Sequence, residues 1–147
     1  MGRAQELPEE GGAYLLLLQR TGRPAEVEVG ALGAVTVRPG FYGYVGSARS
    51  GLRARLERHL RTAGKRTHWH VDYLRSRTDP VAVLVWTGEG ADECALAALA
   101  AGAADGSVPG FGCSDCGCPS HLFYFAREPA AALRALSPAG AWWIEMG

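Results

Sequence analysis

The chain has 147 residues, of which 48% are hydrophobic and 20% are charged, a composition typical of one globular domain and not of a disordered chain. Its apolar runs, such as Ala13–Leu18, are far shorter than the ~20 residues that cross a bilayer. The polar, acidic N-terminus does not resemble a secretory signal. We therefore expect a cytoplasmic protein without a membrane partner.

The charge of the chain is unevenly distributed. Fifteen basic residues balance fifteen acidic ones, so the formal net charge is zero. Residues 49–77, however, hold nine basic residues and two acidic ones, a net charge of +7, and the rest of the chain carries −7. The overall balance argues against nonspecific coating of nucleic acid, whereas the basic segment favours a local contact with phosphates.

The first half of the chain is predicted to consist of strands followed by one helix. Residues 1–11 are expected to form a flexible tail, and residues 12–147 a single domain. A helix is expected to begin after Ser50 as its N-cap and to end near Ala63. The strands, which apolar content and alternation predict, are residues 13–19, 27–29, 34–37 and 41–46.

The second half is predicted to mix helices and strands. Residues 68–74 (HWHVDYL) fit a short helix or an irregular crossing. A buried strand, an Ala-rich helix, a long Cys/His loop, a last strand and a last helix then follow at residues 81–86, 92–101, 106–121, 121–126 and 129–136. This order predicts an α/β (α+β) domain, with a small mixed β-sheet flanked by helices.

Two short tyrosine motifs and one helix carry residues suited to phosphodiester chemistry. The motifs are Gly12–Tyr14 (GAY) and Tyr44–Gly46 (YVG), and the helix carries Arg55 and His59. An Arg and a His four residues apart lie on one face of a helix, and both border its apolar stripe. Cleavage of a phosphodiester needs a base for water, cations for the charge on phosphorus and usually a metal held by carboxylate.

At these motifs the sequence resembles the GIY-YIG nuclease superfamily, and most closely its Uri-type branch of small stand-alone proteins. Five segments carry the resemblance in order: AYLLLL, FYGYVGSA, GLRARLERHLR, HWHVDYL and GFGCSDCGCPSHLFYF. They extend over about residues 12–125, which is most of the chain. The resemblance implies a small mixed sheet flanked by helices, and cleavage of phosphodiesters with a single metal ion.

The resemblance also implies a role for each matching residue. Tyr14 would be the general base for the attacking water, and Tyr44 would line the same site. Arg55 would stabilise the phosphorane, with His59 beside it. Glu93, at the start of the Ala-rich helix, would hold Mg²⁺ or Mn²⁺.

A structural role is the alternative for each of these five residues. The tyrosines can be ordinary sheet aromatics, and the Arg and His can be a solvated pair at the helix edge. The glutamate can be a first-turn acid that favours the helix dipole. Other acidic candidates for the metal ligand are Glu89, Asp92 and Asp72.

The basic segment supplies candidate contacts to nucleic acid, with DNA favoured over RNA. Phosphate contacts fix the position of a nucleic acid without selecting its sequence. Because 147 residues leave no room for a separate recognition domain, a partner protein is a candidate source of specificity. The candidate contacts are Arg49, Arg53, Arg58, Lys65, Arg66, His68 and His70.

The HWHVDYL segment has several explanations that stay open. Its two His and the Trp between them can stack on a base, orient a phosphate or ligate a metal. A buried network, with Asp72 hydrogen-bonded to a His, is the alternative.

A cysteine-rich loop has the spacing of a metal site. Its C-x2-C-x-C-x2-H pattern places three thiols and one imidazole within nine residues, and Zn²⁺ takes four such ligands. These candidates are Cys113, Cys116, Cys118 and His121, and the residues that could complete the site instead are His68, His70 and Cys94. Reduced thiols that pack the loop, and redox chemistry at the first two cysteines, are the alternatives.

The sequence therefore predicts a metal-dependent endonuclease that hydrolyses phosphodiester bonds in DNA, with branched or damaged DNA as a candidate substrate. Two other functions stay open. One is a nucleic-acid-binding module with weak or lost cleavage, and the other is a Cys/His zinc-binding interaction domain.

Overall fold

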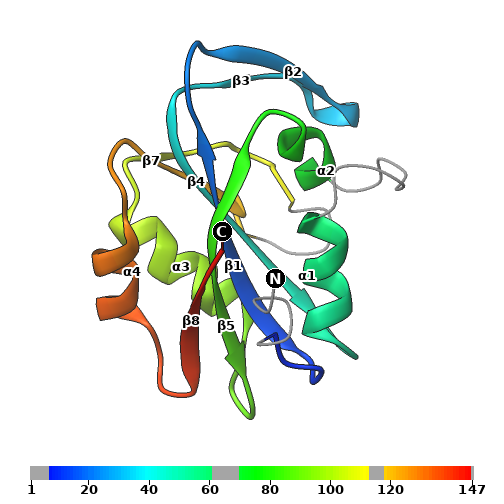
Figure 1. The fold of residues 1–147 in the computed structure, drawn as a ribbon, viewed down its shortest axis with the longest axis vertical. Helices are drawn as coiled ribbons and strands as arrows, with labels where there is room; N and C mark the ends of the chain where they lie inside the picture. The colour runs from blue at the N-terminus through cyan, green and yellow to red at the C-terminus, as the bar shows by residue number, and fades with distance from the viewer. Residues whose placement is uncertain (1–6, 61–69, 113–117, 147) are drawn as a thin grey trace.

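A six-stranded antiparallel sheet forms the centre of the fold (Figure 1). The computed structural model describes residues 7–60, 70–112 and 118–146. In sheet order, its strands are β6 (Gly106–Ser107), β7 (Leu122–Phe125), β4 (Gly40–Ala48), β1 (Gly12–Arg20), β5 (Asp79–Thr87) and β8 (Ala141–Glu145). The predicted α+β class is confirmed. The described strand pairs are all antiparallel, whereas the sequence predicts a mixed sheet.

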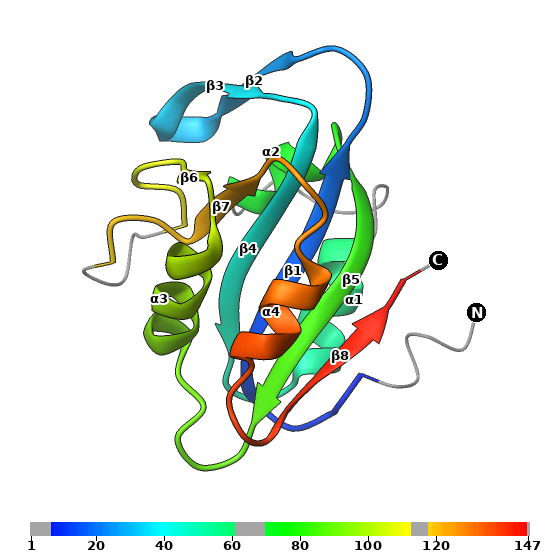
Figure 2. The same ribbon diagram turned by 90° about the vertical axis from the view of Figure 1, so that its left-hand side faces the viewer.

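Helices cover both faces of this sheet (Figures 1 and 2). One face is covered by α1 (Leu52–Leu60) and α2 (His70–Arg75), and the other by α3 (Glu93–Ala103) and α4 (Ala130–Leu136). Among the residues that the structure describes, no helix has the length and apolar character needed to cross a membrane.

The central strand β1 divides its side chains between the two layers, because successive residues of a strand point to opposite faces. Tyr14 and Leu16 pack with the leucines of α1, while Ala13 and Leu15 pack with α3. All four residues are buried. A nearly continuous apolar run is therefore what a central strand covered on both faces requires.

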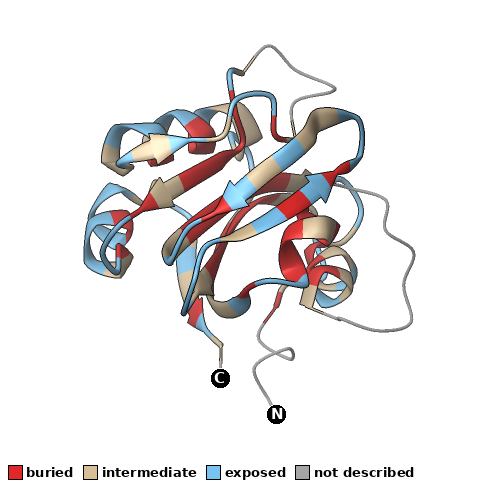
Figure 3. Cartoon of the chain, turned by 90° about the horizontal axis from the view of Figure 1, so that it is seen from above, coloured by how far each residue is buried: buried red, intermediate tan, exposed pale blue. Residues whose placement is uncertain are grey.

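A separate hairpin interrupts the connection between β1 and β4. It consists of β2 (Ala25–Val29) and β3 (Gly33–Val37), joined by a 3-10 turn, and β2 lies against α2. The hairpin leaves β1 after Arg20 and rejoins β4 at Gly40, at the end of the strand pair opposite to Gly12 and Ala48. In Figure 3 its outer residues are exposed, while buried residues concentrate along the central strands.

Residues 7–11 pack against the start of α1, although the sequence assigns them to a flexible tail. The first two amides of the helix donate to the carbonyls of Glu10 and Pro8, at 3.0 and 2.8 Å. The helix begins at Leu52, whereas the predicted cap at Ser50 would begin it at Gly51. A side-chain cap is unnecessary because backbone carbonyls already satisfy these N–H groups.

The second half follows the prediction except at α3, at β8 and at the two-residue strand β6, which lies within the predicted Cys/His loop. The helix α3 continues through Gly102, the residue expected to end it, and its N-cap is Asp92, whose side chain accepts from the amide of Ala95 at 3.1 Å. The strand β8 was not predicted. It pairs with β5 and contains Trp142 and Trp143.

Candidate active site

The two motif tyrosines and the helix histidine form one buried cluster. The hydroxyl of Tyr14 lies 2.7 Å from Nε2 of His59, and both residues are 1% exposed. The ring of Tyr44 lies 6.3 Å from that of Tyr14 and 5.8 Å from that of His59, between centroids. Three elements, β1, β4 and α1, therefore bring together residues that are 45 positions apart in the chain.

The glycine of the second motif makes room for this cluster. The register of β1 and β4 places Tyr14 opposite Gly46, and a Cβ at that position would lie only 2.6 Å from Cζ of the tyrosine ring. Real Cβ atoms do not approach other atoms so closely, so only glycine lets the phenol lie across the neighbouring strand.

The phenol of Tyr14 is held in its protonated form. Burial raises the pKa of Tyr14 well above its usual value, and nearby Tyr44 adds to this effect, whereas the Arg55 guanidinium opposes it. A phenol in this state can donate its O–H to His59. It can therefore accept a proton from water only as it passes its own proton to the imidazole.

A carboxylate lies at the end of β4, on the face of the sheet opposite to the tyrosine cluster. Ser47 Oγ donates to Glu93 Oε1 at 2.6 Å, and Nδ1 of His121 lies 2.8 Å from Glu93 Oε2. The hydrogen bond with His121 is the main cause that lowers the pKa of Glu93, and Ser47 and Arg55 act in the same direction, against burial. The carboxylate is therefore anionic at neutral pH, as a ligand of a hard cation must be.

Arg55 connects the two groups. Its Nη1 donates to the carbonyl of Ser47 at 2.7 Å, and its charge influences both Tyr14 and Glu93. All five residues that the resemblance assigns to catalysis thus lie around the end of β4. Ser47 was not predicted, although it directly follows the YVG motif; its neighbour in space, Glu93, is 46 residues away.

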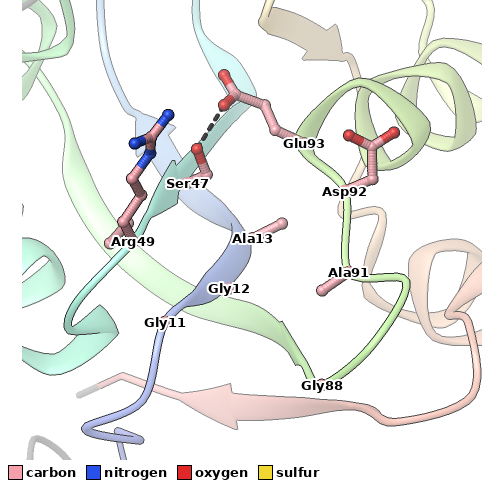
Figure 4. A pocket seen from close by; sticks show the side chains of 10 residues that line it. Gly11, Gly12, Ala13, Ser47, Arg49, Gly88, Ala91, Asp92 and Glu93 are labelled. Atoms are coloured by element: carbon pink, nitrogen blue, oxygen red, sulfur yellow. Dashed lines mark hydrogen bonds between the residues drawn. The ribbon is translucent and has the colours of Figure 1, made fainter.

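A pocket of about 360 Å³ opens next to the carboxylate (Figure 4). Mostly small residues and backbone line it, so it can admit a ligand close to the main chain. Glu93 and Arg49 stand at its upper rim, on either side of Ser47 (Figure 4). The lining residues are Gly11, Gly12, Ala13, Ser47, Ala48, Arg49, Gly88, Ala91, Asp92 and Glu93.

The predicted nucleic-acid contacts have different environments. Arg49 is exposed at the pocket. Arg53 donates to the Leu7 carbonyl at 3.0 Å and pairs with a glutamate of the N-terminal segment at 2.6 Å. Arg58 pairs at 2.8 Å with Asp72, whose side chain is fully buried. Arg53 and Arg58 therefore already contact other parts of the same chain and contribute to the fold.

His70 supports the wall of the tyrosine cluster. Its Nδ1 accepts the amide of Gly112 at 2.8 Å, and its ring packs on Phe111 at 5.2 Å. Gly112 has a φ of +72° and approaches the Tyr44 ring. Burial lowers the pKa of His70, so the neutral ring that this hydrogen bond needs is the favoured form.

The predicted zinc ligands are only partly described. Cys118, His121 and Cys94 place one ligand atom each within 4.8 Å of one another, and His121 is also the partner of the glutamate. The predicted residues that lie outside the described ranges are Lys65, Arg66, His68, Cys113 and Cys116.

Fold and site together define a small α+β domain in which a buried tyrosine–histidine pair and a pocket lined by Glu93 lie on opposite faces of the same strand end. The chain belongs to the family described as domain of unknown function DUF123, whose model matches residues 13–139. No curated protein and no solved structure matches the chain.

Proposed function

We propose that the protein is a metal-dependent endonuclease of the GIY-YIG type, which hydrolyses phosphodiester bonds in DNA and acts in the cytoplasm. The hydrogen bond of 2.7 Å between Tyr14 and His59 carries this proposal. A fully buried phenol and imidazole in contact form a proton-transfer pair. Arg55 and the anionic Glu93 next to them supply the cation and the metal ligand that phosphodiester cleavage requires.

In the proposed mechanism, Tyr14 and His59 activate water together. The phenol oxygen accepts a proton from the attacking water while the phenol O–H proton passes to Nε2 of His59. Arg55 stabilises the negative charge that builds on the phosphate oxygens. Glu93, assisted by the oxygen of Ser47, would hold Mg²⁺ or Mn²⁺, which as a Lewis acid neutralises charge on the phosphate.

The pocket provides the position for the DNA backbone. Arg49 at its rim is placed to contact a phosphate, which positions the strand without selecting its sequence. Few such contacts give weak binding that falls steeply with salt. Selectivity for a branched or damaged substrate would then come from a partner protein.

The test is cleavage of supercoiled plasmid and branched DNA in Mg²⁺ or Mn²⁺. Tyr14→Phe is expected to lower the rate by about 10²–10⁴-fold, the range that general base catalysis contributes. Tyr42→Phe is the matched control. Tyr42, on β4, is buried like Tyr14, but its hydroxyl accepts the amide of Arg38 at 2.8 Å and does not contact His59. Equal rates for the two variants would contradict the assignment of Tyr14.

The metal ligand is tested in the same assay. Glu93→Gln is expected to abolish the metal-dependent cleavage, while Glu89→Gln, at an exposed position shortly before α3, leaves it unchanged. Cleavage that persists in EDTA would contradict the metal dependence. Salt-sensitive binding of DNA by folded wild-type protein, without cleavage, would instead support a binding module.

A further inference from the structure

Two thiols and an imidazole converge at the start of α3, on the side away from the tyrosine cluster. Cys94 is the second residue of the helix, and Cys118 and His121 lie at the end of the cysteine-rich loop. One ligand atom from each lies within 4.8 Å of the others, and the two sulfurs are 2.9 Å apart. Segments 24 residues apart thus contribute to one cluster.

From this convergence we propose a Zn²⁺ site formed by Cys94, Cys118 and His121. Zn²⁺ binds thiolate sulfur at about 2.3 Å and imidazole nitrogen at about 2.0–2.1 Å in tetrahedral geometry. Two thiolates on one such ion lie about 3.8 Å apart, so the sulfurs separate by about an ångström when it binds. Nitrogen and sulfur donors select Zn²⁺ over Mg²⁺, so this site is distinct from the hard-cation site proposed at Glu93.

The surroundings of the cluster suit a metal–thiolate centre better than a disulfide. A disulfide would use the two sulfurs alone, whereas a metal ion would also use the His121 imidazole, whose ligand atom lies within 4.8 Å of both sulfurs. The cluster also borders an apolar pocket of about 270 Å³ lined by Ala97 and Phe123. An apolar shell of this kind limits the access of water to a metal.

The cluster also has an outer partner. Nδ1 of His121 lies 2.8 Å from the Glu93 carboxylate, and metal-bound histidines almost always use their second nitrogen to pair with such a group. In this arrangement His121 would bind zinc through Nε2, with Nδ1 facing the Glu93 carboxylate. This last step rests on the proposed function: zinc would then fix the orientation of the glutamate that holds the catalytic metal.

The zinc content of the full, untagged chain, purified under reducing conditions, tests the site. We expect one zinc per chain by elemental analysis, and after replacement with Co²⁺ the visible bands of a tetrahedral thiolate site. Cys94→Ser and Cys118→Ser are expected to lose both signals. His70→Asn is the matched control for histidine, because His70 is outside the cluster, and it retains both.

Folding and catalysis are measured separately from metal content. Far-UV circular dichroism verifies that Cys94→Ser, at a half-buried position, remains folded. Glu93→Gln is expected to weaken zinc affinity by about 10–100-fold, the usual effect of removing an outer partner. The site is refuted if the folded wild type binds neither Zn²⁺ nor Co²⁺, if both cysteine variants keep the metal, or if the two thiols are found as a disulfide. These readouts need no DNA, so failure of the nuclease proposal leaves them interpretable.

Discussion

The two faces at the end of β4 differ in how far water reaches them. Gly46 points to the face where Tyr14 and His59 are 1% exposed. Ser47 points to the other face, where it holds a Glu93 side chain that is 30% exposed and borders an open pocket. Two consecutive residues of one strand thus separate a dry half of the site from a wet half.

This difference sets the protonation state of each half. On the dry face, burial is the largest influence and raises the pKa of the Tyr14 phenol, which keeps its proton. On the wet face, hydrogen bonds are the largest influence and lower the pKa of the Glu93 carboxyl, which loses its proton. A proton-transfer pair and a metal ligand need these opposite states, and neighbouring faces of one strand provide them.

The strongest test of the dry half is a single added methyl group. Gly46→Ala would place Cβ inside contact distance of the Tyr14 ring, so the phenol must move away from His59. We expect a loss of activity of at least about 100-fold, as for a misplaced catalytic group, and a loss of about 1–3 kcal/mol in unfolding free energy. Plasmid nicking and urea unfolding measure the two effects.

Gly102→Ala is the control for this substitution. Nothing lies within 4 Å of a Cβ at Gly102, which is exposed on α3, so alanine is expected to stabilise the helix by about 0.5–1 kcal/mol. If Gly46→Ala retained full activity, the position of the Tyr14 ring could not be essential for cleavage.

The contrast between buried and open positions also separates two arginines of the basic segment. Arg58→Ala removes a pair with the buried carboxylate of Asp72, and we expect a loss of about 3 kcal/mol in unfolding free energy. Arg49→Ala, at the exposed rim, is expected to change stability by less than about 0.5 kcal/mol. The Arg49→Ala variant should bind DNA more weakly. The slope of log affinity against log salt concentration should become shallower by about one. Equal stability losses in the two variants would remove the distinction.

The fold was predictable where the evidence is local. Apolar runs and turns predict strands β1 to β5 and β7, helical spacing predicts α1, and α3 and α4 are also predicted at residues 92–101 and 129–136. The start of α1 was not predictable, because its first amides are satisfied by carbonyls more than 40 residues away in sequence. The strand β8 was also missed, because the pairing of Trp142 and Trp143 with β5 cannot be deduced from a short aromatic segment.

The site was predictable through motifs and not through charge. The tyrosines, Arg55 and His59 belong to recognisable segments, and the structure brings them together. The contacts of Ser47 and His121 with Glu93 could not be predicted in the same way. They depend on where α3 is placed relative to β4. The net charge of the basic segment does not show that Arg53 and Arg58 are paired internally, because their acidic partners come from other parts of the fold.

Alkaline pH provides a smaller test of the dry half. Because the folded-state pKa of Tyr14 is raised, its protonated form contributes stability that is complete below the unfolded pKa of about 10 and is lost as pH rises toward the folded value. The stability advantage of wild type over Tyr14→Phe should therefore shrink as pH increases from about 9 to about 11. Urea unfolding of both proteins measures it. An advantage that is constant over this range would mean that the phenol is not desolvated in the folded state.

The smallest expected effect concerns the wall that supports Tyr44. Since burial lowers the folded-state pKa of His70, its neutral form contributes stability that is present above the unfolded pKa of about 6.5 and is lost as pH falls through the folded value. His70→Asn keeps an acceptor for the amide of Gly112 but does not titrate. Wild type should therefore lose thermal stability relative to this variant between about pH 7.5 and about pH 5. A difference in melting temperature that does not change with pH would show that burial does not lower the pKa of His70 in the folded protein.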